Sequence, residues 1–153
     1  YIAAWDVHRA ALFGRVSAKI STLAFDAVVA EVMAQEPYRS ARRVFWVVDN
    51  GTIHRGRRAI DRLRTRWPNL ILVHTTVHAS WLNQIEIYFS ILQRKALTPA
   101  DFSSQRAVAD RILGFQHHYQ TVARPFAWRF TRRDLARLLR RCSPSTDSVA
   151  LAA

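Results

Sequence analysis

Two acidic residues, Asp49 and Glu86, stand where an α/β fold usually carries reactive groups. Asp49 directly follows the apolar run Val44–Val48 and precedes Asn50-Gly51, a strong turn signal. A carboxylate in that place is held by the strand before it and faces the crevice at the strand's end. Aspartate is also a common turn former, so the local pattern leaves both roles open for Asp49.

Glu86 falls in the first turn of a helix that the apolar periodicity predicts over about Leu82 to Ala96. There it complements the helix dipole or closes a capping box with Asn83, and the ionised state that the dipole favours also binds cations. One predicted helix and one predicted strand separate Asp49 from Glu86, a βαβ spacing that brings a strand end close to a helix start. Two such carboxylates repel unless a divalent cation lies between them, and oxygen ligands suit Mg²⁺ or Mn²⁺ rather than zinc.

The elements that must position these carboxylates predict one α/β domain over residues 1–142 and a disordered tail over 143–153. The unbroken apolar run Val44–Val48 is typical of a strand covered on both faces. The predicted elements are a hairpin over 1–17, a helix capped by Ser21 or Thr22 and ended by Pro37, a strand over Val44–Val48, a helix over Arg57–Trp67, a strand over Leu70–Val73, and helices over Leu82–Ala96, Ser104–Tyr119 and Thr131–Arg141.

The positive net charge of the chain indicates which class of molecule it binds. Its 153 residues carry 23 Lys and Arg against 11 Asp and Glu, a net charge of +12 at pH 7. The bases are mostly Arg, whose planar fork matches phosphate, which indicates a nucleic-acid partner. Codon usage in a GC-rich genome explains Arg in place of Lys, but it does not explain why bases outnumber acids twofold.

The single cysteine excludes a disulfide framework and fits a reducing compartment, and no segment resembles a membrane span or a signal peptide.

Two blocks of the sequence, Val47–His54 and Val77–Glu86, resemble the DDE-type transposases of the IS630/Tc1-mariner superfamily of mobile elements. The first block carries the family's Asp-Asn-x-x-x-His pattern, and the second carries a Ser-x-x-Leu-Asn-x-x-Glu-like run from Ser80 to Glu86. The helix that follows is also similar. This resemblance implies an RNase H-like (retroviral integrase-like) core, in which a mixed sheet is flanked by helices.

The resemblance also implies an activity. Asp49 becomes the second and Glu86 the third acid of a catalytic triad that holds two divalent ions, Mg²⁺ or Mn²⁺, for DNA strand cleavage and strand transfer. The implied partners are transposon ends and target DNA, and the full-length protein is expected to be a homodimer in the bacterial cytoplasm, associated with the nucleoid. The supporting residues are Asn50, His54 and Asn83, and the DNA-binding candidates are Arg55, Arg57, Arg58, Trp81, Arg94 and Lys95. A capping or packing role for His54 is an equal alternative.

The first acid of the triad is harder to place. Asp6 is the only acid before Asp26, but it ends a predicted strand at a turn, which looks like the family's second strand and favours a turn-forming role. We therefore expect the first strand and its acid to lie upstream of Tyr1, in a chain shortened by truncation or processing. On this interpretation the 153 residues by themselves are inactive and poorly soluble. The alternative is a non-catalytic DNA-binding remnant of a decayed transposase.

Overall fold

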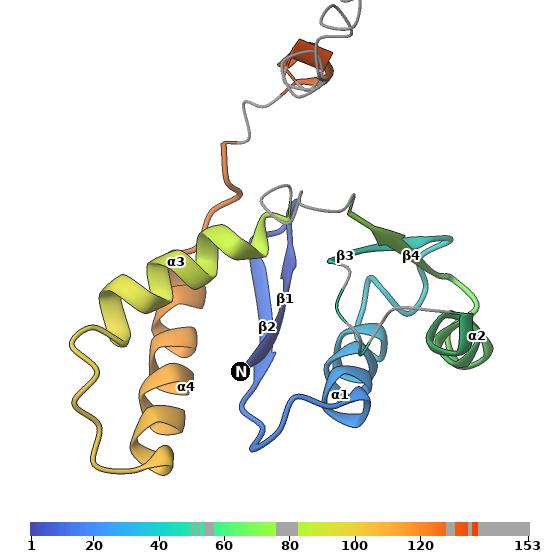
Figure 1. Ribbon diagram of the computed structural model, residues 1–153. Helices are drawn as coiled ribbons and strands as arrows, with labels where there is room; N and C mark the ends of the chain where they lie inside the picture. The colour runs from blue at the N-terminus through green and yellow to red at the C-terminus, as the bar shows by residue number, and fades with distance from the viewer. Residues whose placement is uncertain are drawn as a thin grey trace, which may run out of the picture.

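The computed structural model describes residues 1–49, 51, 53, 57–75, 83–127, 131–134 and 136–137 (Figure 1). Four short strands and four helices make up the main body of this part of the chain. In chain order they are β1 (Ile2–Asp6), β2 (Ala11–Arg15), α1 (Thr22–Met33), β3 (Val44–Val48), α2 (Arg57–Arg66), β4 (Leu70–His74), α3 (Ile85–Ala96) and α4 (Gln105–Val122). None of the described helices is long and apolar enough to cross a membrane.

The predicted hairpin is confirmed. β1 and β2 pair antiparallel, with Ile2 opposite Arg15 and Asp6 opposite Ala11. The Asp6 carboxylate closes the turn, because its Oδ1 accepts hydrogen bonds from the backbone N–H groups of His8 and Arg9 at 2.8 and 2.9 Å. This is an Asx-type turn, so the turn-forming role predicted for Asp6 is also confirmed.

Helices cover the hairpin on both faces. Since side chains alternate along a strand, Leu12 and Trp5 share one face and Ile2 lies on the other. Leu12 is completely buried in a cluster with Tyr88 and other residues of α3 and α4, and Trp5 packs against the same cluster. Ile2 instead packs toward the cluster that contains Phe25 and Val29 of α1. The hairpin is therefore the middle layer of three.

β3 and β4 form a separate parallel pair, in which Val44 lies opposite Leu70 and Val48 opposite His74. One face of this pair packs against α1 and α2 through a cluster that includes Val48, Leu63 and Leu70. The ladder continues past the strands, because the Thr75 N–H donates to the Val48 carbonyl at 2.9 Å. The backbone just before Asp49 is thereby tied to the end of β4.

The other face of the β3–β4 pair corrects one prediction. Phe45, Val47 and Val73 share this face and are 62%, 48% and 41% exposed. The prediction that Val44–Val48 is covered on both faces is therefore wrong for the part of the chain that the structure describes. The physical reason is that α1 and α2 both pack on the opposite face, whereas α3 and α4 pack against the hairpin (Figure 1).

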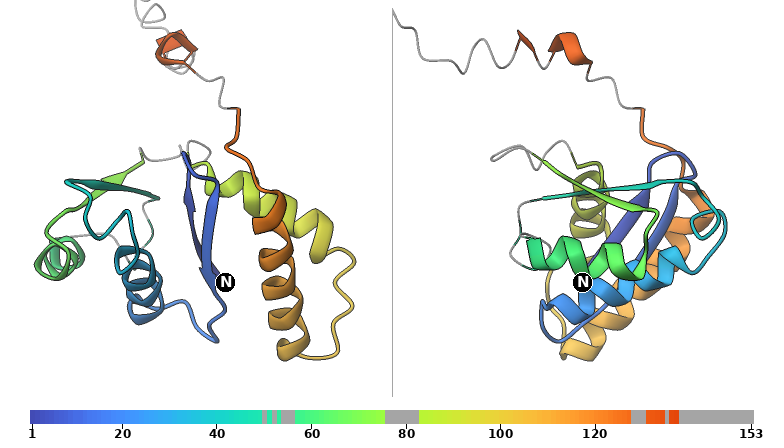
Figure 2. Two further views of the ribbon diagram at one scale, coloured as in Figure 1. Left: turned by 180° about the vertical axis from the view of Figure 1, so that it is seen from behind. Right: turned by 90° about the vertical axis from the view of Figure 1, so that its right-hand side faces the viewer.

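Within the described residues, no strand pairs with both halves. β1 is the strand of the hairpin that lies nearer to β3 in Figure 1 and in the view from behind in Figure 2. The two halves are joined by α1, which contacts both hairpin strands and also packs in the cluster of β3 and β4. Within the described residues, β1 and β3 therefore each have an unpaired edge, and β1 lies on the side of the hairpin toward the β3–β4 pair (Figure 1).

The remaining predicted elements are confirmed with small shifts at their ends. Ser21 caps α1 by accepting from the Ala24 N–H at 3.2 Å, and Ser104 caps α4 by accepting from the Ala107 N–H at 3.1 Å. A capping box between Thr131 and Asp134 starts the helical residues 132–134, which confirms the start of the predicted helix over 131–141, and residues 135 and 138–141 of that helix lie outside the described residues. The predicted tail over 143–153 lies outside the described residues.

Candidate active site

Asp49 lies immediately after β3 and is half-buried. Its Oδ1 accepts a hydrogen bond from the Gly51 N–H at 2.9 Å, which turns the backbone away from the strand. The turn-forming role is thus real, and it holds the carboxylate at the carboxyl end of the β3–β4 pair. This edge of a parallel sheet is where α/β enzymes place their reactive groups, so both roles that the sequence left open are compatible.

Glu86 lies in the first turn of α3 and is exposed. The side chain and the backbone of Asn83 both accept hydrogen bonds from N–H groups of this turn. The Asn83 Oδ1 accepts from the Ile85 N–H at 3.3 Å, and its carbonyl accepts from the Glu86 N–H at 3.1 Å. Among the described residues no capping-box hydrogen bond joins Glu86 to Asn83. The exposed Glu86 carboxylate therefore lies at the positive end of the α3 dipole and is accessible to a cation.

The strand ends and the helix start lie toward the same part of the molecule. Figure 1 shows that β3 and β4 both run toward the hairpin, where α3 begins. Residues 76–82, which connect β4 to this region, lie outside the described residues. The convergence of Asp49 and Glu86 on one site remains a prediction.

A third carboxylate for this site is not found near them: within the described residues, no group of three or more His, Cys, Asp or Glu side chains is placed to hold a metal ion. The Asp6 carboxylate forms hydrogen bonds within the hairpin turn and to Tyr38. Its Oδ2 accepts a hydrogen bond from the Tyr38 hydroxyl at 2.6 Å, in addition to the turn bonds on Oδ1. Partial burial acts to raise the pKa of Asp6, but these hydrogen bonds outweigh it and hold the pKa below its usual value.

Sequence reasoning missed Gln84, the residue between Asn83 and α3. Its Oε1 is buried and has no hydrogen-bond partner in the described structure. A buried amide oxygen without a hydrogen-bond partner costs free energy, and this one lies at the start of the helix that carries Glu86. Apolar periodicity gives no signal for such a residue, because only the packing of the turn buries it.

A family model described as DDE superfamily endonuclease matches residues 1–109, about seven-tenths of the chain. The chain belongs to the DDE endonuclease superfamily. The matched segment includes both Asp49 and Glu86 and ends inside α4. No curated protein and no solved structure matches the chain. Family membership implies an RNase H-like fold, a DNA substrate and a general dependence on divalent metal ions.

The donor chemistry of this DDE endonuclease fits such an ion. Asp49 and Glu86 offer only carboxylate oxygens, which are the ligands that Mg²⁺ and Mn²⁺ prefer. Within the described part of the chain, no three acidic, His or Cys side chains are grouped to hold a metal ion. The two acids are therefore suitable in kind as ligands of such an ion.

The described DNA-binding candidates lie on two helices, α2 and α3. Arg57 and Arg58 are exposed at the start of α2, and Arg94 and Lys95 are exposed in the last turn of α3. At 1.5 Å per residue, Lys95 lies about 14 Å along the helix axis from Glu86. The predicted residues that lie outside the described part of the chain are Asn50, His54, Arg55 and Trp81.

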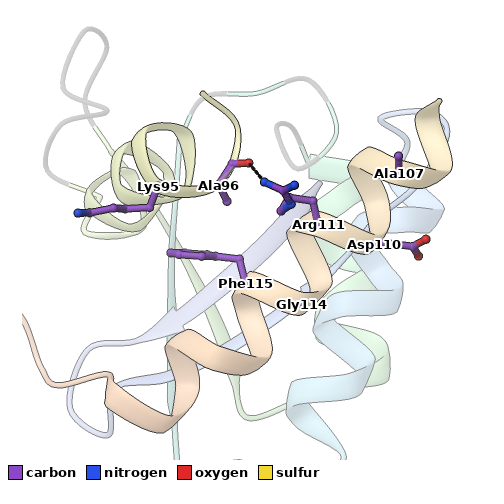
Figure 3. Close-up of a pocket in the computed structure, with 7 residues that line it drawn as sticks. All are labelled: Lys95, Ala96, Ala107, Asp110, Arg111, Gly114 and Phe115. Carbon is purple, nitrogen blue, oxygen red and sulfur yellow. Dashed lines mark hydrogen bonds between the residues drawn. The ribbon is translucent and has the colours of Figure 1, made fainter. Parts of the chain in front are cut away.

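A shallow hollow between α3 and α4 lies at the far end of α3 from Glu86 (Figure 3). Arg111 crosses it, donating to the Ala96 carbonyl at 3.4 Å and lying over the Phe102 ring at 5.7 Å. Arg111 therefore joins the two helices, and the hollow belongs to their packing rather than to the acidic site. The residues that line it are Lys95, Ala96, Ala107, Asp110, Arg111, Gly114 and Phe115.

Proposed function

We propose that this chain belongs to the catalytic domain of an IS630/Tc1-mariner-type DDE transposase, in which Asp49 and Glu86 serve metal-dependent DNA strand cleavage and strand transfer. The observation that carries the proposal is the placement of these two acids. Asp49 follows a parallel strand and Glu86 opens a helix, both within the segment that matches the DDE endonucleases.

Each acid has a defined task in this proposal. Asp49 and Glu86 would hold the divalent ions, Mg²⁺ or Mn²⁺, which supply charge stabilisation for the attacking and the leaving oxygen in a two-metal site. The Gly51 N–H fixes the orientation of the Asp49 carboxylate, and Asn83 fixes the turn that presents Glu86. These hydrogen bonds order the ligands before the DNA arrives, which lowers the cost of assembling the site.

We further propose that a fifth strand completes the RNase H-like sheet between β1 and β3 in a domain over 1–142. The support is that β1 and β3 each have an unpaired edge within the described residues, that β1 lies on the side of the hairpin toward β3, and that α1 packs against both halves. A strand in this place would also bring the third carboxylate. The resemblance puts that strand before Tyr1, and the Asp6 carboxylate already closes the hairpin turn and accepts from the Tyr38 hydroxyl.

DNA is the proposed substrate and partner, as both transposon end and target, bound by a homodimer. The net charge of +12 supports a polyanionic partner. The proposed contacts are Arg55, Arg57, Arg58, Trp81, Arg94 and Lys95, of which the four described residues are all exposed.

A second candidate function is a DNA-binding remnant without catalysis. The observation that favours it is the lack of a third carboxylate near Asp49 and Glu86 among the described residues. The coding sequence before the Tyr1 codon separates the two candidates. An in-frame apolar strand with an Asp supports the enzyme, whereas a stop codon or frameshift supports the remnant.

The functional test is nicking of supercoiled plasmid DNA in Mg²⁺, using the chain together with the segment encoded before Tyr1. We expect Asp49→Asn and Glu86→Gln each to abolish nicking while DNA binding in EDTA is retained. The matched control is Asp110→Asn, an exposed acid on α4 that forms only a surface ion pair with Arg106. Nicking that survives both site substitutions would overturn the proposal, and nicking in none of the proteins would support the remnant.

A further inference from the structure

Four arginines gather at the edge of the β3–β4 pair that lies opposite Asp49. Arg42 and Arg43 directly precede β3, and Arg64 and Arg66 lie in the last turn of α2, just before β4. All four are exposed. We call this set the arginine edge.

Hydrogen bonds bring the two pairs together. The Val44 N–H donates to the Asn69 carbonyl at 2.8 Å, so the residues before β3 lie beside the α2–β4 turn. The Asn69 side chain fixes the same contact from the other direction, because its Nδ2 donates to the carbonyls of Tyr38 and Ala41 at 2.9 Å each. The segment that carries Arg42 and Arg43 is therefore held against the end of α2.

The arginine edge is not neutralised from within. Among the described residues, none of the four arginines forms an ion pair with an acid, and Arg66 only lies over the Trp67 ring at 5.6 Å. The neighbouring bases do have partners, since Arg62 pairs with Asp26 at 2.7 Å and Arg39 pairs with Glu36 at 2.8 Å. The arginine edge therefore keeps its full positive charge, whereas these two neighbouring bases do not.

Stability of the fold explains only half of this charge. Arg64 and Arg66 complement the negative end of the α2 dipole, as basic residues in a last turn do. Arg42 and Arg43 precede a strand, so no helix dipole stabilises their charge. They add like charge to the same edge. Four exposed like charges at one edge of the sheet create a positive local potential, which attracts anions such as phosphate.

The position of the edge separates it from the acids. Arg43 lies six residues before Asp49, at about 3.3 Å per residue, so the arginine edge lies about 20 Å from Asp49 along the strand. That length is too great for these arginines to contact the phosphate being cleaved. It is short enough for them to contact the backbone of the same duplex.

We propose that the arginine edge is a second, non-catalytic docking surface for the phosphate backbone of duplex DNA. This inference rests on the proposed function, which makes DNA the substrate, and adds a place where the duplex is held away from the reacting bond. The guanidinium fork suits phosphate oxygens, and backbone contacts of this kind position a duplex without reading its sequence.

The test is duplex binding by fluorescence anisotropy in EDTA, with mixed-sequence 30-base-pair DNA between 50 and 200 mM KCl. The variants are Arg42→Gln with Arg43→Gln, and Arg64→Gln with Arg66→Gln. The control is Arg106→Gln with Arg124→Gln, which removes the same charge from two exposed sites, one in the first turn of α4 and one just after the helix. Thermal unfolding of each protein confirms that the substitutions leave the fold intact.

Each lost phosphate contact should reduce the slope of log K against log salt by about 0.9. We therefore expect each edge variant to lose about two from the slope and to bind roughly tenfold or more weakly at 100 mM salt, equally for different sequences, while the control changes little. Edge variants that bind like the control would overturn this inference and leave the proposed function standing. Failure of the unaltered chain to bind duplex would instead overturn the proposed function.

An acidic protein is the other polyanion that such an edge could hold. Binding of polyglutamate that is lost in the edge variants, while their duplex binding stays unchanged, would overturn the inference in favour of an acidic protein partner.

Discussion

The hairpin half and the β3–β4 half of the molecule are built from equally short strands but are covered differently. The hairpin has α1 on one face and α3 and α4 on the other, and Leu12 is completely buried between its neighbours. The β3–β4 pair has helices on one face only, and Phe45 is 62% exposed on the other. The half that carries Asp49 is therefore the less completely packed half.

This difference indicates what each half is for. A strand pair with both faces covered gains its stability from the described chain, as a domain core does. An apolar face and an unpaired edge, in contrast, are stable only when something else covers them. In the β3–β4 half the uncovered surface adjoins the proposed site, which fits a region that is completed by a further strand and by DNA.

The largest expected loss of stability comes from a core substitution in the hairpin half. Leu12→Ala should destabilise the protein by about 3 kcal/mol, because it removes buried methyl groups and leaves a cavity between the strands and α3. Urea unfolding followed by circular dichroism measures this change. Leu113→Ala on the exposed side of α4 is the control and should cost well under about 1 kcal/mol. Equal losses for the two variants would contradict the three-layer packing.

A smaller effect is expected where Tyr38 joins the hairpin to the β3–β4 half. Tyr38 donates to Asp6, and its backbone carbonyl accepts from Asn69. Tyr38→Phe removes the hydrogen bond to a charged group, which is worth about 1 kcal/mol after solvent screening at this partly exposed site. Tyr119→Phe is the control, because the described structure gives the Tyr119 hydroxyl no hydrogen bond.

The Tyr38 effect should depend on pH. The pKa of Asp6 is lowered in the folded protein, so its contribution is present above the unfolded value of about 4 and is lost as the pH falls through the folded value. Burial and the bond to Asp6 raise the pKa of Tyr38, so the donor stays protonated at neutral pH. The difference in unfolding free energy between wild type and Tyr38→Phe should therefore shrink below pH 4. A difference that stays constant from pH 7 to pH 3 would contradict this assignment.

The smallest effect is expected on the exposed face of the β3–β4 half. Phe45→Ser should change the free energy of unfolding by no more than about 0.5 kcal/mol, since the side chain is already largely in water. The same substitution should raise the concentration at which the chain stays monomeric in light scattering, because it removes an exposed apolar group. A loss of about 3 kcal/mol would show that another part of the protein covers this face.

The sequence predicted the elements better than their surroundings. The hairpin, the strand ending at Asp49 and the helix carrying Glu86 all follow from apolar periodicity and turn residues, which are local signals. The coverage of Val44–Val48 was predicted wrongly, because an apolar run does not reveal which helices return to which face. Asp6 was correctly read as a turn former, but its bond to Tyr38 joins residues 32 positions apart, which no spacing rule predicts.

The most direct test of the central claim is a crystal structure with Mn²⁺, located by its anomalous scattering, using the chain with the segment encoded before Tyr1. We predict Mn²⁺ between the Asp49 and Glu86 carboxylates, whose oxygens lie within about 8 Å of each other, with a third carboxylate from a strand between β1 and β3. Carboxylates on opposite faces of the sheet, or Mn²⁺ bound only elsewhere, would contradict the account.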